Sequence, residues 1–175
     1  LSVVVPEIKR DMALTDIQYS YVLSAFQFAY MFGMLAAGRV IDRLGTRFGY
    51  LAAMAVWSFA ACMHATVRSA FSLTMWRGLL GLSEAGNFPA AVKAVAEWFP
   101  VRERSFATSL FNSGPHIAVV TGAPVTAFLV LTAGWRMALL IVGATGFLLV
   151  AVWPLIYRNA PETGEEQPQT KSEKH

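Results

Sequence analysis

The chain has 175 residues, of which 55% are hydrophobic and only 14% are charged, and its formal net charge is +3. A typical soluble domain has about 25% charged residues, so this composition argues against an ordinary soluble protein. The basic residues fall at the ends of apolar stretches, which excludes the one-sided basic surface of a nucleic-acid-binding protein. The single cysteine, Cys62, excludes an internal disulfide framework and a cysteine-based metal site.

Long apolar stretches dominate the sequence. A transmembrane helix needs about 18 or more consecutive, mostly apolar residues, and five stretches fit this length, one of them interrupted by charges. We therefore expect an all-α integral membrane protein, a helix bundle of five complete transmembrane spans plus the end of another. The expected spans cover about residues 20–41, 48–67, 71–97, 105–131 and 135–157.

The chain begins without methionine, and its apolar first residues resemble the last turn of a longer helix, so we expect a fragment of a larger protein. Pro6 is expected to end that turn, and residues 7–18 are expected to form an external loop. Thr15 and Asp16 are expected to cap the next helix.

The 20–41 span carries Ala29, Gly33 and Ala37 at intervals of four residues. Such small side chains let another helix approach closely. Gln27 and Tyr30 lie one turn apart on the same span, where they either line a polar cavity or form hydrogen bonds to a neighbouring helix. The sequence leaves both alternatives open.

A short basic loop with the pattern Gly38-x-x-x-Asp42-Arg43-x-Gly45-x-Arg47 joins the first two spans. Gly45 permits a sharp turn, and the Asp42 carboxylate can accept bonds from free helix N–H groups or from a neighbouring arginine. Nine basic residues fall on the side of this loop and four on the other, so the positive-inside rule places the loop in the cytoplasm.

The 71–97 span contains Arg77 and Glu84 in otherwise apolar surroundings. An ionised residue at the bilayer centre costs roughly 2.5–3.5 kcal/mol, so such residues usually face a bundle interior or a water-filled cavity. A separation of seven residues puts both on one helix face, about 10 Å apart. In the alternative interpretation, the long Arg77 side chain places its charged group at the membrane surface. Glu84 lies deeper in the span, and its shorter side chain cannot reach the surface. Pro89 is expected to kink or break this span.

Glu84 has the properties of a proton carrier. Burial favours the neutral carboxyl group, whereas a nearby Arg77 favours the ionised form, and a residue poised between the two can take up and release a proton.

The 105–131 span contains the polar turn Asn112, Ser113 and His116, which either lines the cavity or forms hydrogen bonds between helices. The same span has a second run of small residues at Gly114, Ala118 and Gly122. His64 and Lys93 receive no binding role. Residues 1–158 are expected to form the membrane bundle, and residues 159–175 are too polar to fold and are expected to form a largely disordered cytoplasmic linker.

The loop pattern and the order of the spans resemble the major facilitator superfamily, and the resemblance covers residues 1–162. Within it, Arg77-x-x-x-Gly81-x-x-Glu84-Ala85 resembles the anion:cation symporter family, and Phe111-Asn-Ser-Gly is one of several short segments similar to its hexuronate transporters. The resemblance implies the amino-terminal half of a major facilitator fold in the inner or plasma membrane.

The resemblance implies secondary active transport, with proton-coupled symport of a hexuronate or related sugar acid by alternating access. It implies that Glu84 carries the coupled proton and that Arg77 and Tyr30 bind the carboxylate and hydroxyl groups. Gln27, Asn112 and Ser113 are further candidates for substrate binding, and the loop pattern is a candidate conformational element. The expected partners are the sugar acid, a proton, the lipid bilayer and a carboxyl-terminal half, with no cofactor, metal or nucleic acid.

Three alternatives remain open at this point. The protein could transport another organic anion, such as an aldonate or an aromatic acid, or it could be a non-transporting receptor or assembly subunit. A membrane enzyme would use Glu84, His64 or His116, but no span offers a nucleophile beside a base or three converging metal ligands. We therefore expect that the protein is not an enzyme.

Overall fold

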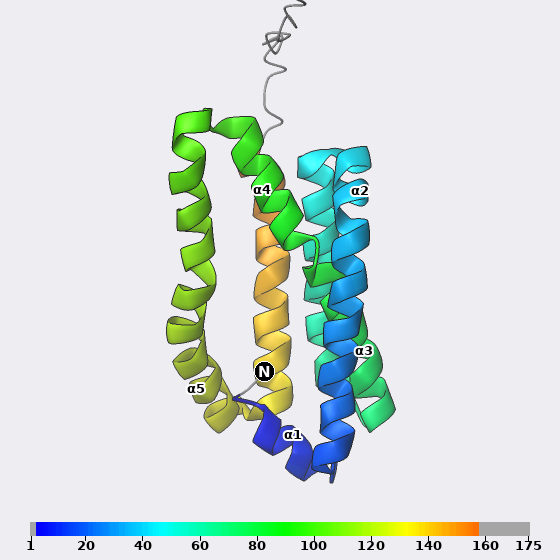
Figure 1. Ribbon diagram of the computed structural model, residues 1–175. Coiled ribbons are helices and arrows are strands. Elements are labelled where there is room, and N and C mark those ends of the chain that lie inside the picture. The colour runs from blue at the N-terminus through cyan, green and yellow to red at the C-terminus, as the bar shows by residue number, and fades with distance from the viewer. Residues whose placement is uncertain (1–2, 158–175) are drawn as a thin grey trace, which may run out of the picture.

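The fold is seen in a computed structural model that describes residues 3–157, and these residues form helices without any strand (Figure 1). The elements are α1 (Val5–Asp11), α2 (Asp16–Met63), the 3-10 turn η1 (His64–Thr66), α3 (Ala70–Glu84), α4 (Asn87–Trp98) and α5 (Val101–Ile156).

Two glycines divide the longest helices into antiparallel limbs. Gly45 (φ 74°) separates the limbs 16–44 and 46–63 of α2, and Gly134 (φ 81°) separates the limbs 101–133 and 135–156 of α5. Positive φ is strained for residues with a Cβ atom but not for glycine, so both reversals occur where the sequence permits them. The turn expected at Gly45 is confirmed.

The expected spans overlap the two limbs of α2, α3 and α4 together, and the two limbs of α5, with ends that differ by up to four residues. Within the described residues, Asp16–Thr66 and Val101–Ile156 are long and apolar enough to cross a membrane. The all-helical class is confirmed, whereas the count of five complete spans and the division at residue 158 stay predictions. The expected linker 159–175 lies outside the described residues.

The amino-terminal region differs from the expectation. Residues 7–11 belong to α1 and not to a loop, and Pro6 lies in the first turn of this helix and does not end a turn. Proline is favoured there because the N–H groups in the first turn of a helix have no partner within the helix, so the N–H group that proline lacks is not needed. The cap at Thr15 is confirmed: its hydroxyl accepts from the Gln18 N–H (3.2 Å), and the Gln18 side chain accepts from the Thr15 N–H (3.0 Å).

Close backbone contact joins α2 and α3. A Cβ atom added at Gly81 would lie 2.5 Å from the carbonyl oxygen of Phe26, and one added at Gly33 would lie 2.7 Å from that of Leu82. The close approach expected at Gly33 is confirmed. Gly143, in the second limb of α5, meets α2 in the same way, since its added Cβ would lie 2.6 Å from the Cys62 nitrogen.

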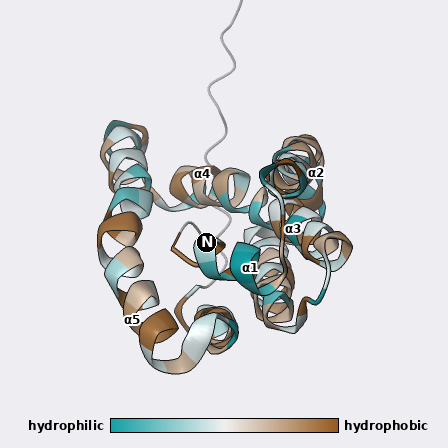
Figure 2. Cartoon of the chain, turned by 90° about the horizontal axis from the view of Figure 1, so that it is seen from below, coloured by the Kyte–Doolittle hydropathy of each residue, from teal (hydrophilic) through white to brown (hydrophobic). Residues whose placement is uncertain are grey.

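The first limb of α5 stands apart from this packed group in Figures 1 and 2. An added Cβ at Gly114 or Gly122 would meet nothing within 4 Å among the described residues. The second run of small residues therefore makes no close helix contact in this part of the chain.

α1 covers one end of the bundle, between the two limbs of α5 and the α2–α3 pair (Figure 2). Val4 and Ile8 are buried in a cluster with Leu73 and Leu139. Arg136 fastens the same end because it pairs with Asp11 (2.9 Å) and donates to the carbonyls of Ala65 and Val67.

Replacing Gly81 by alanine should destabilise the protein by about 1–3 kcal/mol, because the new methyl group overlaps the Phe26 backbone. Gly78→Ala on the same helix is the matched control, since its added Cβ meets nothing within 4 Å and alanine favours helix. Thermal unfolding of the purified protein in detergent should show a lower midpoint for Gly81→Ala only. Equal midpoints for the two variants would contradict the close contact.

Candidate binding cavity

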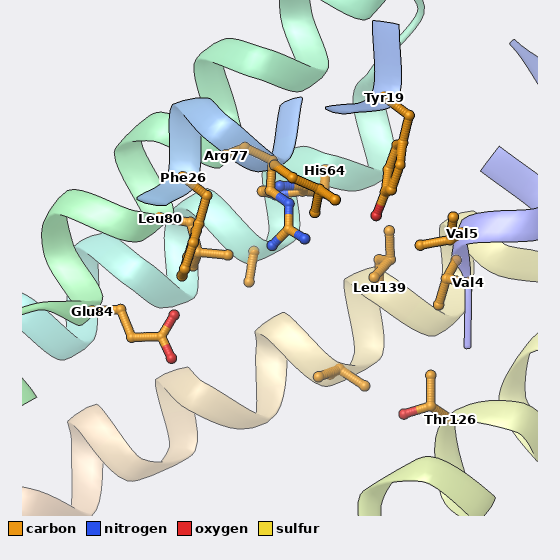
Figure 3. A pocket seen from close by; sticks show the side chains of 13 residues that line it. Val4, Val5, Tyr19, Phe26, His64, Arg77, Leu80, Glu84, Thr126 and Leu139 are labelled. Atoms are coloured by element: carbon orange, nitrogen blue, oxygen red, sulfur yellow. The ribbon is translucent and has the colours of Figure 1, made fainter. Parts of the chain in front are cut away.

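A cavity of about 770 Å³ lies at the α1 end of the bundle, among α1, α2, α3 and α5 (Figure 3). Its wall is mostly apolar, and its polar side chains come from α2, η1, α3 and α5. They are Tyr19, His64, Arg77, Glu84 and Thr126. A few polar groups converging in an apolar cavity of about 300–1,000 Å³ are typical of small-molecule sites.

Arg77 and Glu84 both face this cavity, as their spacing on α3 predicts. The guanidinium lies over the Phe26 ring, 5.2 Å from its centroid, and in Figure 3 it points into the cavity, with Glu84 at the far end of the same wall. No carboxylate of a described residue lies within 4.0 Å of Arg77. The cation and the acid therefore share the cavity without forming an ion pair.

The helix that bears Glu84 ends at this residue. α3 stops at Glu84 and α4 begins at Asn87, so the break precedes Pro89. Pro89 has no N–H to donate to the carbonyl four residues earlier, that of Ala85. The break expected from Pro89 is confirmed, and it places the carboxyl group of Glu84 at a helix end beside the cavity.

Tyr30 and Gln27 lie outside the cavity wall. Tyr30 is one turn beyond Phe26 and stacks on its ring with centroids 6.0 Å apart. Gln27 is exposed and lines a separate hollow of about 300 Å³ beside Phe28 and Met31. Their predicted substrate-binding roles stay predictions.

Asn112 and Ser113 lie on the first limb of α5, away from the cavity wall. Asn112 is exposed, and the Ser113 hydroxyl donates to the Leu110 carbonyl (2.6 Å) within its own helix. The same limb contributes Thr126 to the cavity. The polar turn is therefore not among the cavity-lining residues in the described part of the chain.

Three polar residues of the cavity wall had no predicted binding role: Tyr19, His64 and Thr126. A signal existed for the first, because Tyr19, Leu23 and Phe26 follow one another at helical spacing and all line the cavity. His64 and Thr126 carry no local signal, since their positions depend on which helices meet.

The loop residues lie at the opposite end of the bundle. Asp42 accepts from Lys93 of α4 (2.8 Å) and not from a helix N–H group or an arginine, which corrects the expectation for its partner. Arg47 donates to the Pro154 carbonyl at the end of α5 (2.9 Å). Gly38 and Arg43 precede the turn at Gly45, with the Arg43 side chain exposed. The loop thus contacts two later helices.

Residues 1–175 match the Major Facilitator Superfamily. The chain belongs to this superfamily. The Hexuronate transporter of Escherichia coli (strain K12) is 34% identical over 154 residues, which are 88% of this chain and 36% of that protein. The Galacturonate transporter of Dickeya chrysanthemi is 33% identical over 88% of this chain and 45% of its own length.

A bacterial homolog of the human lysosomal transporter Spinster, solved in an inward-facing and unoccupied conformation, shares the fold with a TM-score of 0.76. It is 23% identical, and the match covers 97% of this chain and 41% of that one. The chain therefore spans less than half the length of these relatives. It belongs to a family of integral membrane transporters, and the expectation that it is not an enzyme is confirmed by the family match and by the relatives at 33% and 34% identity.

A cysteine introduced at the cavity wall should react with a small water-soluble thiosulfonate, because only a hydrated thiol forms the reactive thiolate. We expect labelling of Leu80→Cys and Thr126→Cys, measured by mass spectrometry on membranes. Leu148→Cys, on the outer face of α5 (67% exposed), is the control and should stay unlabelled in lipid. Cys62, which is 7% exposed, and any cysteine that the complete transporter carries outside this sequence are replaced first. Equal labelling at all three positions would contradict a hydrated cavity.

Proposed function

We propose that this chain is the amino-terminal half of a secondary transporter in the inner membrane that couples the entry of a sugar acid, such as a hexuronate, to a proton. The observation that carries the proposal is that Arg77 and Glu84 face one cavity without pairing. Two relatives, at 33% and 34% identity, are named for galacturonate and hexuronate, and another at 33% is named as a probable galactarate/D-glucarate transporter, which favours sugar acids as the substrate class.

Arg77 is the anion-binding group in this proposal. Its guanidinium remains charged and presents paired donors that match the two oxygens of a carboxylate. The apolar wall that includes Phe26 and Leu80 lowers the local polarity, so the attraction between the two charges is stronger than in water. The hydroxyl groups of a sugar acid would then meet the polar side chains of Tyr19 and Thr126, which line the same cavity.

Glu84 is the proton-coupling group, and among residues 3–157 it is the only acidic residue in the cavity wall. While Glu84 is ionised, its negative charge opposes the entry of a carboxylate into the same cavity. Protonation removes this repulsion and leaves the positive charge of Arg77 available. Binding of the proton and of the anion would therefore favour each other, which supports their coupled transport.

Transport by alternating access requires a second half that closes around a midplane site. This chain supplies one wall. The basic loop around Asp42 and Arg47 lies at the opposite end of the bundle from α1, and the positive-inside rule favours a cytoplasmic location for it. The contacts of this loop with α4 and α5 make it a suitable conformational element at the cytoplasmic side.

The proposal is tested by uptake of labelled galacturonate into vesicles that contain the complete transporter, driven by a pH gradient. Glu84→Gln should retain galacturonate exchange but lose accumulation, because the amide keeps the shape of the side chain and cannot bind and release a proton. A variant that still concentrates galacturonate would place the proton carrier elsewhere. Absence of galacturonate uptake by the wild type would overturn the proposed substrate class.

The role of Arg77 is tested by Arg77→Lys in the complete transporter. If the guanidinium holds the carboxylate, lysine should weaken galacturonate binding about tenfold or more, or about 1.4 kcal/mol, because an ammonium cannot form the paired bonds. Calorimetry on the purified variant measures this, with normal abundance and thermal stability as controls. An affinity within about twofold of wild type would remove Arg77 from the substrate site.

A further inference from the structure

His64 follows α2 at the α1 end of the bundle and is almost fully buried, with 1% of its surface exposed. Its Nδ1 lies 2.6 Å from the carbonyl oxygen of Ala60. A carbonyl oxygen only accepts hydrogen bonds, so Nδ1 carries the hydrogen of the neutral ring. The tautomer is therefore assigned by this partner, and Nε2 holds the lone pair.

The Nε2 atom is buried and has no hydrogen-bond partner among the described residues. Buried polar atoms nearly always have a partner, and those that lack one call for a specific explanation. His64 lines the cavity that also contains Arg77, and Figure 3 shows its ring beside the arginine side chain. The hydrogen-bonding capacities of the two residues are complementary: Arg77 can only donate hydrogen bonds, and the Nε2 atom of His64 can only accept one.

We propose that His64 is a specificity-determining residue whose Nε2 accepts a hydrogen bond from a hydroxyl group of the acid whose carboxylate binds Arg77. This inference rests on the proposed function. A molecule that satisfies both residues carries a carboxylate and a hydroxyl group close together, which is a hydroxy acid. Nε2 is buried and the ring lies beside Arg77 in Figure 3, so we expect the hydroxyl group to reach Nε2 only after the Arg77 side chain has moved toward the carboxylate.

The other polar groups near Arg77 do not impose this requirement. The hydroxyls of Tyr19 and Thr126 can donate or accept, so they tolerate either kind of ligand group. Glu84 can accept, but it lies at the other end of the cavity wall, beyond Phe26 (Figure 3). His64 is thus the neighbour of Arg77 that selects a hydrogen-bond donor and disfavours acids that lack a hydroxyl group at that position.

Calorimetric binding of galacturonate and of its 2-, 3- and 4-deoxy analogues to the purified complete transporter tests this inference. At least one deoxy analogue should bind the wild type about threefold to tenfold more weakly than galacturonate, the range expected for one hydrogen bond. His64→Asn retains a donor near the Nδ1 position but does not reach Nε2, so it should reduce that difference to within about twofold. His64→Gln carries an amide oxygen near the Nε2 position and should preserve the difference.

A uniform loss of affinity for all four ligands in His64→Asn would indicate a packing role and overturn the inference. Equal affinities of the wild type for galacturonate and every deoxy analogue would overturn it as well, without need of a variant. In both cases galacturonate still binds the wild type, so the proposed function survives. If the wild type binds no uronate, the proposed function fails and this inference fails with it.

Discussion

The close approach of α2 and α3 is the constraint on which the cavity depends. Within a bilayer the tails of the lipids are as apolar as leucine, so helices associate through van der Waals packing more than through the hydrophobic effect. Gly81 allows α3 to reach the backbone of Phe26. The same contact sets the Phe26 ring under the Arg77 guanidinium, and this half-buried cation of α3 faces the cavity.

The break between α3 and α4 divides one expected span into two parts with different neighbours. The first part carries Arg77 and Glu84 along the cavity. The second part is fastened to the basic loop, because Lys93 binds Asp42 and Glu97 accepts from the Thr46 hydroxyl (2.8 Å). The residues that face the cavity and those that contact the loop therefore lie on two successive helices, α3 and α4, separated only by Ala85 and Gly86.

Much of the local structure could be predicted from the sequence because its causes are local. The cap at Thr15, the reversal at Gly45 and the break before Pro89 each follow from the chemistry of one or two residues. The shared face of Arg77 and Glu84 follows from helical periodicity alone. Amphipathic short helices are harder to predict. The sequence of α1 predicts a loop because its charged residues resemble those of a loop, while Ile8 is buried in a cluster that later parts of the chain complete with Leu73 and Leu139.

The sequence by itself determined that the chain is a helical membrane protein of the Major Facilitator Superfamily and which face of α3 carries its charges, since composition, periodicity and motif spacing are properties of the chain alone. Only the tertiary structure decided which polar residues surround those charges. It placed His64 and Thr126 in the cavity wall and left Asn112 and Ser113 outside it. The physical reason is that a cavity forms where several helices meet, and no single helix encodes the position of its neighbours.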